Sequence, residues 1–154
     1  NLVIADPEPG RSDRLSHILG AKVVGIDDIA EVEADVFAPC ALGGALTRNV
    51  ARRLRARLVC GAANNQLASA EIAPLLMARG IAYVPDYVAN AGGIISVSAE
   101  YLGEGRSDVE ARVAEIAPRV AVILEQAARE QRSPADVADE MAENMIASAS
   151  RMAA

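Results

Sequence analysis

Short apolar runs alternate with segments of helical periodicity along this chain, and that alternation most constrains its fold. Five runs are too short to be helices, and each ends at or next to glycine, proline or aspartate, which is typical of buried strands. The predicted strands are residues 2–5, 22–25, 34–40, 58–61 and 81–84. Strands that alternate with helices predict an α/β fold, with a Rossmann-like doubly wound parallel sheet.

The segments between and after these runs have apolar residues at helical spacing. The predicted helices are one capped by Ser12 and ended by Gly20, and others over 47–55, 69–79, 90–102, 107–131 and from 134 onward. Pro118 is expected to bend the longest of them, because proline lacks an N–H and its ring crowds the preceding turn. The chain therefore divides into a Rossmann-like core over about 1–90 and a helical part over about 91–154.

Composition and charge exclude several classes of protein. The residues are 52% hydrophobic but only 3% aromatic, so the core must be built from Ala, Val, Ile and Leu. The net charge of -6 argues against a nucleic-acid partner, and the arginines over 48–57 are better explained as a solvated helix. No apolar run reaches the roughly 18 residues of a membrane-spanning helix, and there is no signal peptide, so we expect a cytoplasmic protein.

The two cysteines do not form a credible metal site. Cys40 and Cys60 lie at equivalent ends of two predicted strands, but the single histidine, His17, lies on a distant helix. We interpret both cysteines as buried apolar thiols, and we expect no metal.

Ligands of a parallel α/β sheet bind beyond the carboxyl ends of its strands. Asp6 ends the first strand, where dinucleotide folds place the carboxylate that binds the adenosine ribose, although a turn-forming Asp before Pro explains it as well. The partner signature G-x-G-x-x-G belongs about 20 residues upstream of that acid. We therefore expect the glycine-rich loop to lie before residue 1.

Small and amide side chains follow the third and fourth strands. Residues 41–44 and 61–63 contain only Gly, Ala and Leu42, which leaves room for a flat cofactor or allows tight helix–strand packing. Asn64 and Asn65 each offer a donor and an acceptor, but asparagine is also common in turns. These patterns alone leave two alternatives open, a ligand site or ordinary packing and turns.

Three stretches together resemble the Glu/Leu/Phe/Val dehydrogenase family, in particular its leucine, valine and phenylalanine branch. They are VFAPCALGGALT (36–47), VCGAANNQLA (59–68) and GIAYVPDYVANAGGIISVSAEYLG (80–103). The resemblance implies an NAD-dependent oxidative deamination of an apolar L-amino acid (Leu, Val, Ile or Phe) to a 2-oxo acid and ammonia. It also implies a homo-oligomer in the full-length enzyme, and acid–base residues in a catalytic domain that this chain does not contain.

The resemblance assigns roles position by position. It implies cofactor contacts at Asp6, Ala41, Leu42, Ala62, Ala63 and Asn64. It implies substrate contacts at Asn64, Asn90, Ile94 and Val97. No residue of this chain matches the catalytic lysine or aspartate, so we expect the chain alone to be inactive. The alternative that stays open is a non-catalytic module that binds a nucleotide or an amino acid.

Overall fold

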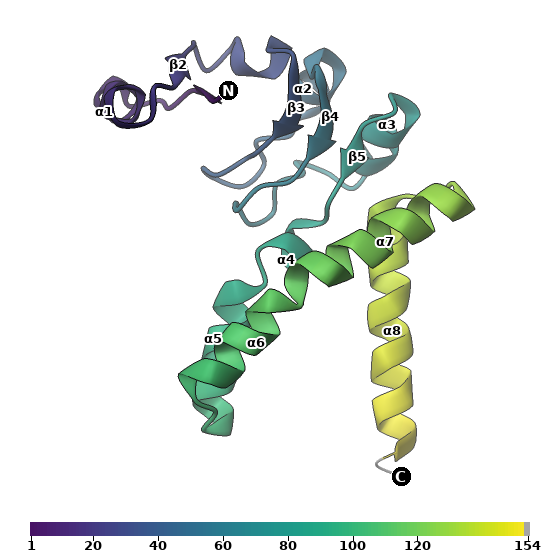
Figure 1. Cartoon of the computed structure of the whole chain (residues 1–154). Coiled ribbons are helices and arrows are strands. Elements are labelled where there is room, and N and C mark those ends of the chain that lie inside the picture. The colour runs from purple at the N-terminus through teal and green to yellow at the C-terminus, as the bar shows by residue number, and fades with distance from the viewer. Residues whose placement is uncertain (153–154) are drawn as a thin grey trace.

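The computed structural model describes residues 1–152 and contains parallel strands joined by helices (Figure 1), so the α/β prediction is confirmed. The strands form two ladders instead of one sheet. Strand β1 (Val3–Ile4) pairs with β2 (Lys22–Val23), and helix α1 (Pro9–Leu19) joins them. Strands β3 (Ala34–Phe37), β4 (Ala56–Val59) and β5 (Ala82–Tyr83) form the second ladder, in that order. Within residues 1–152 no ladder connects the two groups.

The three-stranded ladder aligns the carboxyl ends of its strands. Phe37 of β3 pairs with Val59 of β4, and Val59 pairs with Tyr83 of β5. β3 ends two residues before Pro39, which has no N–H to donate to a ladder. Because the strands are parallel and in register, the loops that follow them lie side by side at one edge.

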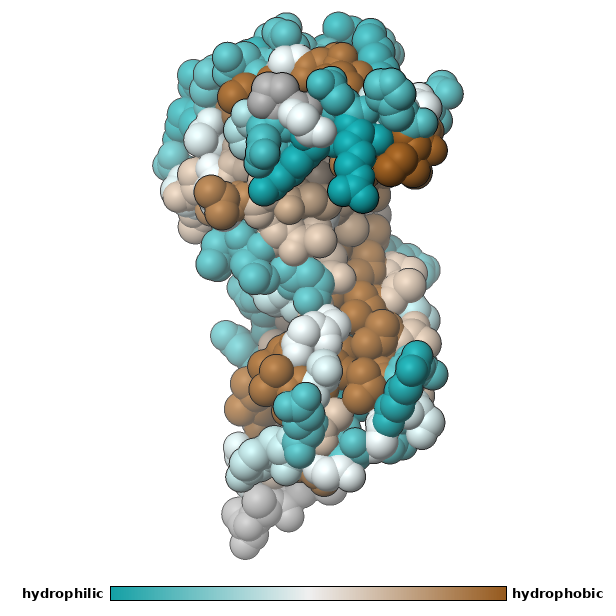
Figure 2. Space-filling view, turned by 90° about the vertical axis from the view of Figure 1, so that its left-hand side faces the viewer, coloured by the Kyte–Doolittle hydropathy of each residue, from teal (hydrophilic) through white to brown (hydrophobic). Residues whose placement is uncertain are grey.

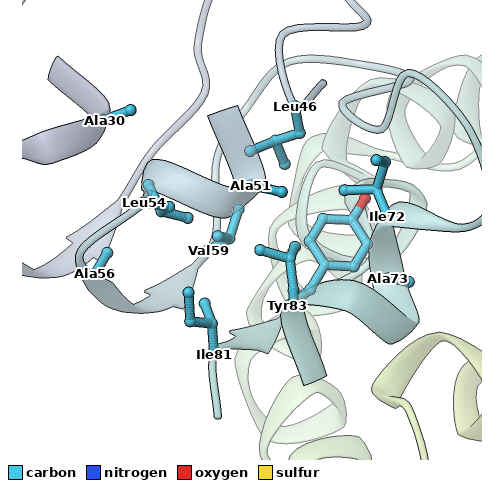
Figure 3. Close-up of a cluster of buried hydrophobic side chains, with 11 residues drawn as sticks. Ala30, Leu46, Ala51, Leu54, Ala56, Val59, Ile72, Ala73, Ile81 and Tyr83 are labelled. Atoms are coloured by element: carbon cyan, nitrogen blue, oxygen red, sulfur yellow. The ribbon is translucent and has the colours of Figure 1, made fainter. Parts of the chain in front are cut away.

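Helices α2 (Arg48–Arg53) and α3 (Ile72–Ala78) pack on this ladder and form the main core (Figure 3). Thr47 caps α2, since its Oγ1 accepts the N–H of Val50 at 3.2 Å. The cluster consists of buried alanines, aliphatic residues and one tyrosine: Ala30, Leu46, Ala51, Leu54, Ala56, Val59, Ile72, Ala73, Leu76, Ile81 and Tyr83. Ala30 comes from a short 3₁₀-helix, Ile29–Glu31, that the sequence did not predict.

The first ladder is less covered. Leu15, Ile18 and Leu19 of α1 remain 43%, 64% and 57% exposed. The prediction that Ser12 caps α1 is wrong, because the helix begins earlier, at Pro9, and Ser12 is buried inside it. The Asp6 side chain accepts the N–H of Glu8 at 2.8 Å and so turns the chain just before the helix. Gly20 ends α1 in a left-handed conformation, as expected.

The remaining helices follow β5: α4 (Asp86–Ala89), α5 (Gly92–Leu102), α6 (Arg106–Ala114), α7 (Ile116–Glu130) and α8 (Pro134–Met152). Residues 153–154 of the predicted helical part lie outside the described residues. The single helix expected over 107–131 is wrong, because it divides at Glu115 into α6 and α7. Pro118 explains the division, since it cannot donate to the carbonyl of Ala114 and its ring crowds that carbonyl.

Helix α8 packs on α7 only through its first half. Ile123 and Ala127 of α7 form a buried cluster with Val137 and Ala138 of α8. Residues 142–151 are all exposed, and Figure 1 shows α8 running away from the rest of the molecule. Hydrophobic side chains remain on the surface of the lower half of the molecule (Figure 2), where the helical part lies. No helix within residues 1–152 has the length and apolar character needed to cross a membrane.

Candidate functional site

Two clefts open beside the strand ends. The first, of about 260 Å³, lies at the β1–β2 ladder. It is lined by Asp6, Pro7, Ser12, Asp13, Val23, Val24, Gly25 and Ile26. Asp6 is partly buried at this cleft, whose wall is otherwise largely aliphatic. The Ser12 hydroxyl is buried and has no hydrogen-bond partner within the described residues.

The second cleft, of about 540 Å³, lies between the loop after β4 and the helices after β5. It is lined by Ala62, Asn64, Tyr87, Asn90, Ala91, Gly93, Ile94 and Val97. Five of the residues singled out in the sequence thus come together here: Ala62, Asn64, Asn90, Ile94 and Val97. Ile94 and Val97 are 65% and 62% exposed, so the aliphatic wall of this cleft is open on one side.

The amide of Asn90 fixes the orientation of Asn64. Asn90 Nδ2 donates to the backbone oxygens of Ala62 and Ala63, at 3.3 and 3.2 Å, and to Asn64 Oδ1 at 2.7 Å. Backbone oxygens only accept hydrogen bonds, so the NH₂ group of Asn90 must face this loop, and the Asn64 atom that it meets must be the oxygen. These contacts leave the Asn64 NH₂ group and the Asn90 side-chain oxygen available for other partners, and both residues line the cleft.

The next residue, Asn65, has a left-handed backbone with φ 52°, a conformation that asparagine tolerates better than most residues with a Cβ. Both of its backbone polar groups are held. Its N–H donates to Asp86 Oδ2 at 2.7 Å, and its oxygen accepts the N–H of Gly44 at 2.7 Å. Asp86 Oδ1 in turn accepts the hydroxyl of Tyr83 at 2.8 Å. The loop is thus tied to a side chain of the main core.

Gln66 supports the same loop from inside. It is fully buried, and its Nε2 donates to the backbone oxygens of Gly61 and Ala63 at 2.8 and 3.0 Å. Gln66 and Asp86 are not among the site residues predicted from the sequence. The signal for Asp86 was present, because it directly follows the fifth apolar run and Pro85, as Asp6 follows the first run.

Two glycines of this region are required by packing. A Cβ on Gly43 would lie 2.8 Å from the backbone oxygen of Asn64, and a Cβ on Gly61 would overlap the backbone of Pro39. These glycines bring the loops after β3 and β4 into contact. For them, the packing explanation left open by the sequence is sufficient.

The other predicted cofactor residues lie outside the second cleft. Ala41 and Leu42 are exposed on the loop after β3, and Leu42 is 86% exposed. Ala63 is buried beneath the cleft, where its N–H donates to the backbone oxygen of Pro39 at 2.9 Å. Asp6 lies at the first cleft. The predicted set is therefore divided between two clefts and one exposed loop.

The interpretation of both cysteines as buried thiols is wrong. Cys40 is exposed and Cys60 is only partly buried, because β3 and β4 end before them and place them in the open loops. Partial burial raises the pKa of the Cys60 thiol above its usual value, and nearby Cys40 raises it further. Residues 1–152 contain no group of three or more His, Cys, Asp or Glu side chains arranged to hold a metal ion.

Two tyrosines near the second cleft donate hydrogen bonds to carboxylates. Burial raises the pKa of the Tyr83 phenol above its usual value, and the hydrogen bond to Asp86 raises it further. Burial also raises the pKa of Tyr87, whose hydroxyl donates to Asp139 of α8. A phenol is neutral at pH 7 even with its ordinary pKa, so these shifts only extend that state to more alkaline pH, and each hydroxyl donates to the carboxylate beside it.

Comparisons with known proteins agree with this fold. The family model of glutamate/leucine/phenylalanine/valine dehydrogenase matches residues 11–154. Leucine dehydrogenase of Thermoactinomyces intermedius is 39% identical over 145 residues, which cover 94% of this chain and 40% of that protein. Valine dehydrogenase of Streptomyces albus is 44% identical over 128 residues, which cover 82% and 35%.

A solved structure is also similar over nearly the whole chain. The crystal structure of L-tryptophan dehydrogenase from Nostoc punctiforme matches with a TM-score of 0.92 and 36% identity, over 98% of this chain and 46% of that chain. This chain therefore belongs to the Glu/Leu/Phe/Val dehydrogenase family, as the sequence motifs predicted. It spans less than half the length of these relatives.

Proposed function

We propose that the whole protein is an NAD-dependent amino-acid dehydrogenase, and that it oxidatively deaminates an apolar L-amino acid to a 2-oxo acid and ammonia. Leu, Val, Ile and Phe are the candidate substrates. The observation that supports this most is the second cleft, where an oriented amide of Asn64 lies beside the aliphatic side chains of Ile94 and Val97. Relatives named leucine and valine dehydrogenase support the same class of substrate.

The first cleft suits the adenosine end of a dinucleotide. A carboxylate there is a natural acceptor for two ribose hydroxyls, and it disfavours a phosphate on the 2′ oxygen by repulsion. Asp6 offers that carboxylate beside the aliphatic residues Val24 and Ile26. When bound, NAD would supply the hydride acceptor. In this proposal Ala62 and Asn64 lie along its nicotinamide half, buried Ala63 supports them from below, and Ala41 and Leu42 flank the cofactor from the loop after β3.

The second cleft suits the amino acid. Asn64 presents an NH₂ donor, which matches an oxygen of a substrate carboxylate or of the cofactor carboxamide. Asn90 presents an acceptor, which matches an ammonium group or an amide N–H. Ile94 and Val97 then contact the apolar side chain, and binding there is governed by shape and burial. The role of these residues is to orient the reacting groups.

We further propose that residues 1–154 are only the NAD-binding part of the enzyme. The chain corresponds to 40% of leucine dehydrogenase and to 46% of the solved L-tryptophan dehydrogenase chain. The separation of the two ladders supports this division, because one more strand between β1 and β3 would join them into one sheet. In the proposal, the glycine-rich loop and the acid–base residues belong to the rest of the polypeptide, which assembles as a homo-oligomer.

The direct test is NADH formation by the whole protein with Leu, Val, Ile, Phe and Glu in turn, with the chain of residues 1–154 as the inactive control. We expect turnover with at least one apolar amino acid, equal amounts of NADH and ammonia, and none from the control. Binding of NAD or an amino acid without turnover of any of them would contradict the proposal and favour a non-catalytic binding module.

Asn64→Ala in the whole enzyme tests the site itself. If the amide loses one hydrogen bond of about 1.4 kcal/mol in the transition state, kcat/KM falls about 10-fold. Asn49→Ala is the matched control, because it removes an exposed amide from α2, away from both clefts. Equal kinetics of the two variants would reduce Asn64 to a turn residue.

A further inference from the structure

Asp86 lies behind the second cleft and does not line it, yet it is connected to both of the asparagines that do. It begins α4, the helix that leads to Asn90. Its Oδ2 accepts the N–H of Asn65 at 2.7 Å, one residue along the chain from Asn64. Its Oδ1 accepts the hydroxyl of Tyr83 at 2.8 Å, and Tyr83 is only 3% exposed in the main core. One carboxylate therefore joins the core to the cleft.

We propose that Asp86 is a positioning residue: it holds Asn65 in its left-handed conformation and thereby fixes the direction in which Asn64 presents its NH₂ group. This inference rests on the proposed function, because the presented group matters only if the cleft binds the reacting ligands.

The loop has an alternative conformation, and a restraint selects between the two. Asn65 has φ 52°, a region that asparagine tolerates better than most residues with a Cβ, although negative φ is open to it as well. A change of Asn65 to negative φ would rotate the peptide plane that follows Asn64. That rotation would separate Asn64 Oδ1 from Asn90 Nδ2, now 2.7 Å apart, and would leave the Asn64 amide free to turn.

Restraint from the other side comes through the Gly44 N–H, which donates to the Asn65 oxygen at 2.7 Å. Within the described residues, the Asn65 N–H donates to the Asp86 carboxylate and to no other side chain. A carboxylate can accept from Asn65 and from Tyr83 at the same time, one hydrogen bond at each oxygen. This double acceptance explains why a short acid suits position 86.

Four variants of the whole enzyme separate positioning from mere stability. Asp86→Ala removes both hydrogen bonds. Asp86→Asn keeps the hydrogen bond from Asn65, which the amide oxygen accepts, and replaces the one from Tyr83 by a bond in which the amide nitrogen donates to the Tyr83 oxygen. Asp86→Ala is also combined with Asn64→Ala. Asp35→Ala is the control, since it removes an exposed carboxylate from β3, far from the loop.

We expect Asp86→Ala to lower kcat/KM for the amino acid about 10-fold, and Asp86→Asn to restore it to within about threefold of the wild type. In the Asn64→Ala background, Asp86→Ala should lower kcat/KM by less than about threefold more, because residues that act through each other are not additive. Asp35→Ala should match the wild type. If Asp86→Ala does not fold, Asp86→Ser carries the same expectation, since serine is too short to reach Asn65.

Crystal structures of the wild type and of the Asp86→Ala variant give a readout that is independent of turnover. We expect Asn65 to leave the left-handed region in the variant and the Asn64–Asn90 hydrogen bond to break. An unchanged loop, unchanged kcat/KM in a folded variant, or a full 10-fold further loss in the Asn64→Ala background would each overturn the proposal. Absence of turnover in the wild type refutes the proposed function instead, and the crystal structures still decide whether Asp86 holds the loop.

Discussion

The two strand ladders are built from the same local pattern but differ in how well they are covered. In the β3–β5 ladder, α2 and α3 bury Leu54 and Leu76 to 1% and 0% exposure. In the β1–β2 ladder, α1 leaves Ile18 and Leu19 64% and 57% exposed. Both ladders have parallel strands joined by a helix. The difference shows that the strand–helix pattern specifies a pair of parallel strands with a connecting helix. How deeply the side chains of that helix are buried depends on the other elements that pack against it.

The largest difference in stability is expected between a leucine of α3, on the β3–β5 ladder, and a leucine of α1, on the β1–β2 ladder. Leu76→Ala should lower the free energy of unfolding of the chain by about 2–5 kcal/mol, because it leaves a cavity in a fully enclosed site. Leu19→Ala, with the same change of side chain on exposed α1, should cost less than about 1 kcal/mol. Urea denaturation of the chain of residues 1–154 measures both. Equal losses would mean that the two ladders are equally buried, which contradicts the comparison.

Glycine substitutions sharpen the contrast, because the expected effects differ in sign. Gly61→Ala should destabilise the chain by about 1–3 kcal/mol, since the new Cβ overlaps the backbone of Pro39. Gly10→Ala in α1 meets no atom within 4 Å and should be neutral or stabilising by up to about 1 kcal/mol, because alanine favours the helix. Thermal unfolding of the two variants is the measurement. A destabilising Gly10→Ala would show that the first ladder is packed more closely than the structure indicates.

The cap of α2 should have a moderate effect. Thr47→Ala removes the side-chain acceptor of the Val50 N–H and should cost about 1 kcal/mol. Thr47→Ser keeps the hydroxyl and should recover most of that loss, as denaturant midpoints of the three proteins would show. A loss as large for Thr47→Ser would assign the effect to the methyl group, and the cap would then contribute little.

An ion pair between α2 and the residue before α3 should have the smallest effect. Arg48 lies 2.7 Å from Glu71, and this hydrogen bond lowers the pKa of the Glu71 carboxyl. Because the folded pKa lies below the unfolded one, the stabilisation is present above the unfolded pKa and is lost as the pH falls through the folded pKa, below about 4.5.

Arg48→Ala should return the pKa of Glu71 towards its ordinary value, which carboxyl NMR titration can follow. Because both side chains are half exposed, 1 M salt should remove most of the difference between the wild type and the variant. A difference that persists in high salt would mean that the pair is more buried than its exposure indicates.

Local signals in the sequence predicted much of the fold. Each of the five apolar runs overlaps a strand, and Gly20 ends its helix as expected. Boundaries were less accurate: β4 begins at Ala56, two residues before the predicted strand, because register with β3 decides its start. Pro118 was expected only to bend one helix over 107–131, but the helix divides three residues earlier, at Glu115, since a proline disturbs the turn that precedes it.

Long-range features could not be predicted in the same way. The exposure of Leu19, the partial exposure of Cys60 and the separation of the ladders depend on which elements meet. At the candidate site, five predicted residues share one cleft, because parallel strands bring their following loops to one edge. The hydrogen bond between Asp86 and the Asn65 N–H could not be predicted from the sequence, since the two residues are 21 positions apart.

We propose that one dinucleotide spans both ladders, with its adenosine at the first cleft and its nicotinamide at the second. A crystal structure of the whole protein with NADH and a branched-chain 2-oxo acid tests this arrangement. We expect Asp6 to accept hydrogen bonds from the adenosine ribose, and the Asn64 NH₂ group to contact the nicotinamide or the 2-oxo acid beside Ile94. A dinucleotide bound away from Asp6, or a 2-oxo acid outside the cleft of Asn64, would contradict this arrangement.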